Sequence, residues 1–146
     1  MIDNATDASI GVVVADDDPA AASLLAGALA SLSESGVETE DIFVSHVPTI
    51  GQLPFAARQM AVVKEPSAVV MLGIATGTVD DVQLKSTLRI LDNALAQLNI
   101  RHDIPFIDGI VRAATPTNAD EARRSGGSSA TAALQMANMM ASLINS

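Results

Sequence analysis

Three consecutive aspartates, Asp16-Asp17-Asp18, are the most concentrated group of chemically active side chains in this sequence. Carboxylate oxygens are the ligands that Mg²⁺ and Ca²⁺ prefer, so the cluster could hold a hard cation. Asp18 precedes Pro19, however, and this pair is typical of the beginning of a helix, where the aspartate acts as N-cap. Both interpretations stay open, and capping is the simpler one for Asp18.

A second segment, Thr76-Gly77-Thr78, places a glycine between two hydroxyl side chains, just ahead of a long helical pattern. Backbone N–H groups and hydroxyls in such a position can bind a phosphate. The alternative is an ordinary turn in which Asp80 or Asp81 caps the following helix. These two carboxylates would repel a phosphate if they pointed towards it.

The chain contains two histidines and no cysteine, which excludes disulfides and thiolate zinc sites. His46 and His102 lack the partner spacing of a metal pair or of a Ser-His-Asp arrangement, so we expect structural roles for both. Met136, Met139 and Met140 form a stripe at helical spacing, which favours packing in the core or between subunits over a ligand surface.

Charge and length limit the partners. A net charge of −9 with eight Lys and Arg argues against nucleic acid or an anionic membrane. The first residues are polar and acidic, unlike a signal peptide, and no apolar run approaches the roughly 18 residues of a membrane span, so we expect a cytoplasmic protein. The 146 residues suit one domain, 1–146, with a flexible N-terminal segment at 1–8.

Strands and helices alternate along the chain. Four short apolar runs predict strands at residues 10–15, 42–47, 68–74 and 105–111. Between them we expect one helix from Asp18-Pro19 to Gly36 and another that starts near Leu53-Pro54. A short helix at 118–124 and a separate one at 129–143 should close the chain. The third helix carries an apolar stripe of Leu84, Leu88, Leu91, Leu95 and Leu98.

This alternation predicts an α/β fold: a three-layer αβα, flavodoxin-like sheet of four parallel strands with helices on both faces. In such sheets ligands bind beyond the carboxyl ends of the strands, where the strand order reverses. The loops at 16–18, 48–52, 76–78 and 108–109 are therefore where a site is expected.

Five segments carry a family resemblance: residues 36–42, 47–57, 105–111, 124–126 and 134–138. They include Val47-Pro48-Thr49-Ile50-Gly51-Gln52-Leu53-Pro54 and Arg124-Ser125-Gly126. In order and spacing they resemble the lumazine synthase (6,7-dimethyl-8-ribityllumazine synthase) family over nearly the whole chain. The archaeal riboflavin synthases, which share that fold, are a weaker match.

The resemblance implies the lumazine synthase fold and a homopentamer, sometimes packed into an icosahedral shell, with a small-molecule site at the junction of two subunits. It also implies riboflavin-biosynthesis chemistry. That reaction condenses 5-amino-6-ribitylaminouracil with 3,4-dihydroxy-2-butanone 4-phosphate, releasing phosphate and water. Neither a metal nor an organic cofactor is implied.

Several positions depart from the family pattern. Asp17 and Asp108 stand where the family has aromatic residues, and a carboxylate cannot stack on a pyrimidine ring. The loop after the second strand has Gly51 for another aromatic residue and Gln52 for a glutamate. No histidine lies in the third loop, which normally carries the residue that assists proton transfer. His46 and Asp81 remain as weak catalytic candidates.

The resemblance nevertheless implies a set of binding positions. Arg124 matches the phosphate-binding arginine of the family, and Gly77 and Thr78 are expected to bind the same phosphate. The lysine-containing loop that normally follows this arginine is shortened to 127–129. Asp17, Gln52 and Asp108 are expected to converge on one cleft, which would be acidic and would favour an amine or a cation. The expected substrate-binding residues are Asp16, Asp17, Thr49, Ile50, Gly51, Gln52, Ile74, Ala75, Thr76 and Asp108.

Three functions are compatible with these residues. The first is a divergent lumazine synthase whose condensation is much reduced. The second is a non-catalytic pentameric scaffold or binding protein. The third is an enzyme repurposed for another small, aminated metabolite. The fold alone cannot choose among them, because function resides in the site.

Overall fold

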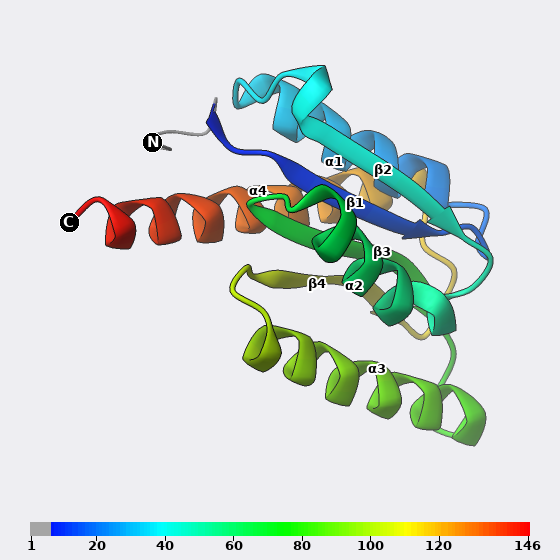
Figure 1. The fold of residues 1–146 in the computed structure, drawn as a ribbon. Coiled ribbons are helices and arrows are strands. Elements are labelled where there is room, and N and C mark those ends of the chain that lie inside the picture. Colours follow the sequence, from blue (N-terminus) through cyan, green and yellow to red (C-terminus); the bar gives the residue numbers. More distant parts are fainter. Residues whose placement is uncertain (1–6) are drawn as a thin grey trace.

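The computed structural model describes residues 7–146 (Figure 1). The N-terminal segment that we expected to be flexible falls mostly on residues 1–6, which lie outside the described residues. Ala8, the last residue of the segment expected to be flexible, is fully buried and belongs to the hydrophobic core.

Four parallel strands form the sheet in the order β2-β1-β3-β4. Their apolar, β-branched sequences suit a sheet that is covered on both faces, and every residue of β1 is buried. The prediction of a parallel four-stranded sheet is confirmed. The strands are β1 (Ile10–Ala15), β2 (Ile42–Val47), β3 (Ala68–Thr76) and β4 (Phe106–Ala113).

Two helices cover each face, which gives the predicted three layers (Figure 1). Helices α1 (Ala21–Glu34) and α4 (Ala119–Ile144) pack on one face, and α2 (Leu53–Lys64) and α3 (Val82–Arg101) pack on the other. Two short 3₁₀ turns, η2 (Thr39–Asp41) and η3 (Ile50–Gln52), flank β2. The leucine stripe of α3 faces the sheet as expected, with Leu91 and Leu98 buried.

The two helices predicted at 118–124 and 129–143 are one continuous helix, α4, so this prediction was wrong. The run Gly126-Gly127 looks like a break because glycine weakens an isolated helix. In the fold, however, a Cβ added at Gly126 would lie 1.9 Å from the carbonyl oxygen of Leu24 in α1. The glycine is there because the two helices cross in backbone contact.

The last two strands extend further than predicted, to Thr76 and to Ala113. Asp108 is therefore the third residue of β4, paired with Met71, and does not stand at the end of the strand. Thr76 pairs with Ala113 as the last rung of the ladder. Among residues 7–146, no helix is long and apolar enough to cross a membrane.

Candidate functional site

The carboxyl ends of β1, β2 and β3 lie at one edge of the sheet, so the loops that follow them meet there (Figure 1). Both ladders continue one step into these loops. The N–H of Asp16 donates to the carbonyl of Val47 at 2.9 Å, and the N–H of Gly77 donates to the carbonyl of Ala113 at 2.9 Å. The backbone frame of this edge is thus held by the sheet itself.

The three aspartates after β1 turn to three different partners. Asp16 binds Nδ1 of His46 at 3.0 Å, and Oδ2 of Asp17 accepts a hydrogen bond from the N–H of Ile50 at 3.3 Å. Oδ1 of Asp18 accepts from the N–H of Ala20 at 2.9 Å. No group of three His, Cys, Asp or Glu able to hold a metal occurs in the described part of the chain. The divergent carboxylates give no support to a cation site.

Asp18 supports the beginning of α1 in a slightly different way from the prediction. The helix begins at Ala21 and its N-cap is Ala20, whose side chain cannot cap. Asp18 instead closes the turn before the helix, through its carboxylate to Ala20 and its carbonyl to the N–H of Ala21 at 3.0 Å.

In the loop after β2, Gln52 is used within the chain. Its Oε1 accepts hydrogen bonds from the N–H of Thr49 at 2.8 Å and from Oγ1–H of Thr49 at 2.7 Å. Gly51 is exposed, whereas Ile50 is buried against β3 at Gly73. The amide oxygen of Gln52, at the position where the family has a glutamate, therefore caps η3.

The turn after β3 carries a negative charge where a phosphate was expected. Oδ1 of Asp81 accepts from the N–H of Leu84 at 2.9 Å, which confirms Asp81 as the N-cap of α3. A Cβ at Gly77 would lie 3.2 Å from Oδ2 of the same carboxylate. Of the neighbouring predicted residues, the side chains of Ile74 and Ala75 are buried in the core and only that of Thr78 is exposed.

Arg124, the expected phosphate ligand, lies on the other face of the sheet from Gly77. It lines a shallow groove between α1 and α4, beside Ser31 and Glu34, whereas Gly77 lies against α3. Arg124 makes no ion pair with any residue from 7 to 146. Within one chain, the predicted group of Gly77, Thr78 and Arg124 is therefore not assembled.

Asp108 belongs to a separate cluster on the outer strand β4. Nη2 of Arg112 lies 3.1 Å from Asp108 and 2.6 Å from Asp92 of α3. The hydrogen bond from Arg112 lowers the pKa of Asp92, and the same bond raises the pKa of Arg112. Within one chain, Asp108 does not converge with Asp17 and Gln52, because its pairing with Arg112 holds it at β4 and α3; its convergence with them at a junction of two subunits stays a prediction.

The two histidines differ in their surroundings. His102 packs edge-on against Phe106, with 5.4 Å between ring centroids, before the amino end of β4, which agrees with a structural role. His46 is at the carboxyl edge, where Nδ1 lies within hydrogen-bond distance of the Asp16 carboxylate, and both side chains are about half exposed, at 53% and 51%. His46 is thus the histidine that borders the loops of the candidate site.

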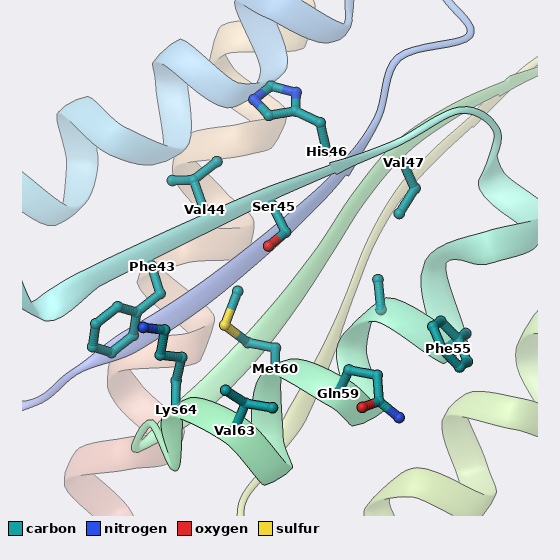
Figure 2. Close-up of a pocket in the computed structure, with 11 residues that line it drawn as sticks. Phe43, Val44, Ser45, His46, Val47, Phe55, Gln59, Met60, Val63 and Lys64 are labelled. Atoms are coloured by element: carbon teal, nitrogen blue, oxygen red, sulfur yellow. The ribbon is translucent and has the colours of Figure 1, made fainter.

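A groove beside β2 was not predicted from the sequence. It has a volume of about 570 Å³ and runs between the outer edge of β2 and helix α2 (Figure 2). Its lining is mainly apolar, and Phe55 is 71% exposed. Lys64 closes one end, with Nζ 5.3 Å from the ring centroid of Phe43. The sequence feature that could have indicated this groove is the presence of apolar residues on the solvent face of α2, where polar residues are usual: Phe55, Val62 and Val63.

The methionine stripe of α4 is also partly open. Met136 and Met139 are 38% and 40% exposed, and with Met140 they border a hollow beside Ile104. The stripe is therefore not closed within the core of this chain, and packing between subunits remains the prediction for it.

Comparison with known proteins places these observations in a family. The sequence model of 6,7-dimethyl-8-ribityllumazine synthase matches residues 7–141. A 6,7-dimethyl-8-ribityllumazine synthase from Parabacteroides distasonis is 32% identical over 127 residues, which cover 86% of this chain and 78% of that protein. The family model spans the four strands and the loops at their carboxyl ends, and the chain therefore belongs to the lumazine synthase family.

Proposed function

We propose that this protein is a divergent, homopentameric lumazine synthase that carries out the riboflavin-type condensation at a much reduced rate. The observation that carries the proposal is the backbone frame at the carboxyl edge of the sheet, where the loops after β1, β2 and β3 meet in a chain that matches the family over residues 7–141. Holding two reactants together accelerates their reaction strongly even where few side chains assist.

The side chains of the site explain why the rate should be low. Asp17 cannot stack on a pyrimidine, and each lost stack costs roughly 1–3 kcal/mol by analogy with bases on aromatic side chains. The loop 76–81 contains no histidine, so no imidazole stands at the position that the family uses for proton transfer, and proton transfer by a well-positioned group is worth about 10²–10⁴-fold in rate. Asp81 adds a negative charge next to Gly77, which weakens phosphate binding there.

Self-assembly is supported by two features of the single chain. The first is the apolar groove between β2 and α2, which borders the candidate site at His46 and Val47. The second is the distribution of the expected ligands. Arg124 and Asp108 lie away from Asp17 and Gly77 in one chain, and a junction between two subunits is the arrangement that can bring them to one cleft.

Turnover tests the catalytic part of the proposal. The purified protein is mixed with 5-amino-6-ribitylaminouracil and 3,4-dihydroxy-2-butanone 4-phosphate, and lumazine absorbance is followed against a protein-free reaction. We expect slow, protein-dependent product formation. An absence of turnover at high protein concentration would contradict it. Light scattering on the same sample distinguishes a pentamer from a larger shell, and a monomer would contradict the assembly.

A non-catalytic scaffold or binding protein is the second candidate, and a specific observation favours it. Three polar side chains at the expected binding positions already have partners within the chain: Asp16 with His46, Asp17 with Ile50, Gln52 with Thr49. The hydroxyl oxygen of Thr76, at another of these positions, is buried and has no hydrogen-bond partner among the described residues. A pentamer with no turnover supports this candidate. Thermal-shift measurements then separate binding of ribityl-pyrimidines or phosphate from binding of amines, and stabilisation by amines alone would favour a repurposed enzyme.

A further inference from the structure

We propose that His46, oriented by Asp16, is the catalytic residue that transfers protons in the condensation; this inference rests on the proposed function. Asp16 acts through His46 and is a positioning residue. The proposal starts from the contact between the Asp16 carboxylate and Nδ1 of His46, which joins the ends of two neighbouring strands at the edge where the candidate site lies.

The backbone fixes this pair. His46 is the fifth residue of β2 and pairs with Val14 of β1, and Asp16 lies two residues further along the β1 chain. The N–H of Asp16 donates to the carbonyl of Val47 at 2.9 Å, so the carboxylate is held next to the imidazole. Nδ1 of His46 then lies 3.1 Å from Oδ1 and 3.0 Å from Oδ2 of Asp16.

This contact selects one form of the imidazole. A carboxylate at Nδ1 holds the proton there in the neutral ring, which leaves Nε2 as the acceptor. Nε2 makes no hydrogen bond to any described residue of the chain. The His46 side chain is 53% exposed, so Nε2 is accessible to a ligand. His46 borders the groove beside β2, but its side chain projects from the opposite side of the strand to Phe43, Ser45 and Val47, away from α2 (Figure 2).

Other ionisable or amide groups at this edge are less suited to move a proton. Asp81 is engaged as the N-cap of α3, and Asp17 binds the N–H of Ile50. Gln52 has no titratable proton, and its Oε1 is bonded to Thr49. Asp16 is the charged group in direct contact with His46, and Asp17 follows it in the same loop.

The step assigned to His46 balances without a further reactant. When the amine of the pyrimidine attacks the ketone carbon, a C–N bond forms and the carbonyl π electrons move to oxygen. Nε2 takes the proton that the amine nitrogen loses, and His46 becomes an imidazolium ion paired with Asp16. The imidazolium returns this proton to the oxygen, which becomes a hydroxyl group. A second transfer through Nε2 carries the remaining N–H proton to the hydroxyl, which leaves as water as the C–O bond breaks and the C=N bond of the imine forms, so that His46 ends neutral.

Three variants and one control test the assignment in the full-length, assembled protein. His46→Gln should lower kcat by about 10²-fold with little change in KM. Asp16→Asn should lower kcat less, because an amide at Nδ1 favours the wrong tautomer. His102→Gln removes the other histidine, which packs against Phe106 away from this edge, and should keep the parent rate. Light scattering confirms that each variant keeps the parent assembly.

Chemical rescue separates catalysis from a structural role. His46→Ala leaves a gap at a half-exposed position, so imidazole added to the buffer should restore turnover in proportion to its concentration. A lost fold would not be restored in this way. If His46→Gln keeps the kcat of the parent, or if imidazole does not restore turnover to His46→Ala, His46 is not the proton-transfer residue. Either result would leave the proposed condensation reaction unaffected. An absence of turnover in the unaltered protein overturns both.

Discussion

Adding one methyl group at Gly126 or at Gly127 should change the stability of this protein in opposite directions. Gly126 faces α1, where an added Cβ would meet the Leu24 carbonyl oxygen at 1.9 Å and the Ala28 nitrogen at 3.1 Å. Gly127 is the next residue of the same helix, and its Cβ would lie 3.6 Å from the nearest atom, the carbonyl oxygen of Gly27. Replacing glycine by alanine therefore changes the helix propensity by the same amount at both positions, whereas the added methyl group clashes with α1 only at Gly126.

The magnitudes follow from these distances. Real Cβ atoms essentially never approach closer than 3.0 Å, so Gly126→Ala requires α1 and α4 to separate locally by about 1 Å. A gap of that size forfeits about a quarter to a half of each van der Waals contact, and overpacking typically costs about 1–3 kcal/mol. Gly127→Ala meets no clash and should raise the free energy of unfolding by up to about 1 kcal/mol through helix propensity.

Urea unfolding followed by circular dichroism measures this difference, at one protein concentration because assembly contributes to apparent stability. We expect Gly126→Ala to be less stable than the parent and Gly127→Ala to be more stable than the parent. In thermal unfolding the separation should be about 2–4 °C per kcal/mol. If Gly126→Ala is as stable as Gly127→Ala, the backbone contact between α1 and α4 does not exist.

Three further changes test other parts of the fold. Asn99→Ala should lower the free energy of unfolding by about 1–3 kcal/mol in urea titrations, because the Asn99 amide accepts from the N–H of Phe106 at 2.7 Å and donates to its carbonyl at 3.1 Å; a neutral result would refute this bridge. Asp92→Asn should destabilise the protein at pH 7 but not in acid. The bond from Arg112 lowers the pKa of Asp92, so its contribution is full above the unfolded value of 3.8 and is lost as the pH falls through the lower folded value; a difference from the parent that persists in acid would contradict this. Asp81→Ala should cost about 1 kcal/mol as a lost N-cap, measured by thermal unfolding, and Asp81→Asn serves as the control that keeps a capping oxygen.

Much of the secondary structure could be predicted because its signals are local. The strands at 10–15 and 42–47 have the predicted bounds, since short β-branched runs with polar ends leave little choice of limits. The end of α1 was predicted from Gly36, which has a φ of 92° after the helix. Asp81 was predicted as one of two possible caps of α3, and its side chain does cap that helix.

The site was predictable only as a location. The order of strands and helices placed the informative loops at the carboxyl edge, and the structure brings Asp16, Asp17 and Gln52 to that edge. The partners of these side chains could not be read from the sequence, because His46 is thirty residues from Asp16 and meets it only through the pairing of β1 with β2. The same holds for Arg112 and Asp92, which hold Asp108 away from the other site residues.

By itself, the sequence determined the alternation of strands and helices, the parallel sheet and membership of the lumazine synthase family, since all of these follow from periodicity and ordered motifs. It also determined which chemical groups the loops contain. Only the tertiary structure decided how Gly126 is used and which carboxylates are already paired. The physical reason is that helix packing and hydrogen bonding depend on distances between residues far apart in the chain, and one sequence position does not specify its neighbour in space.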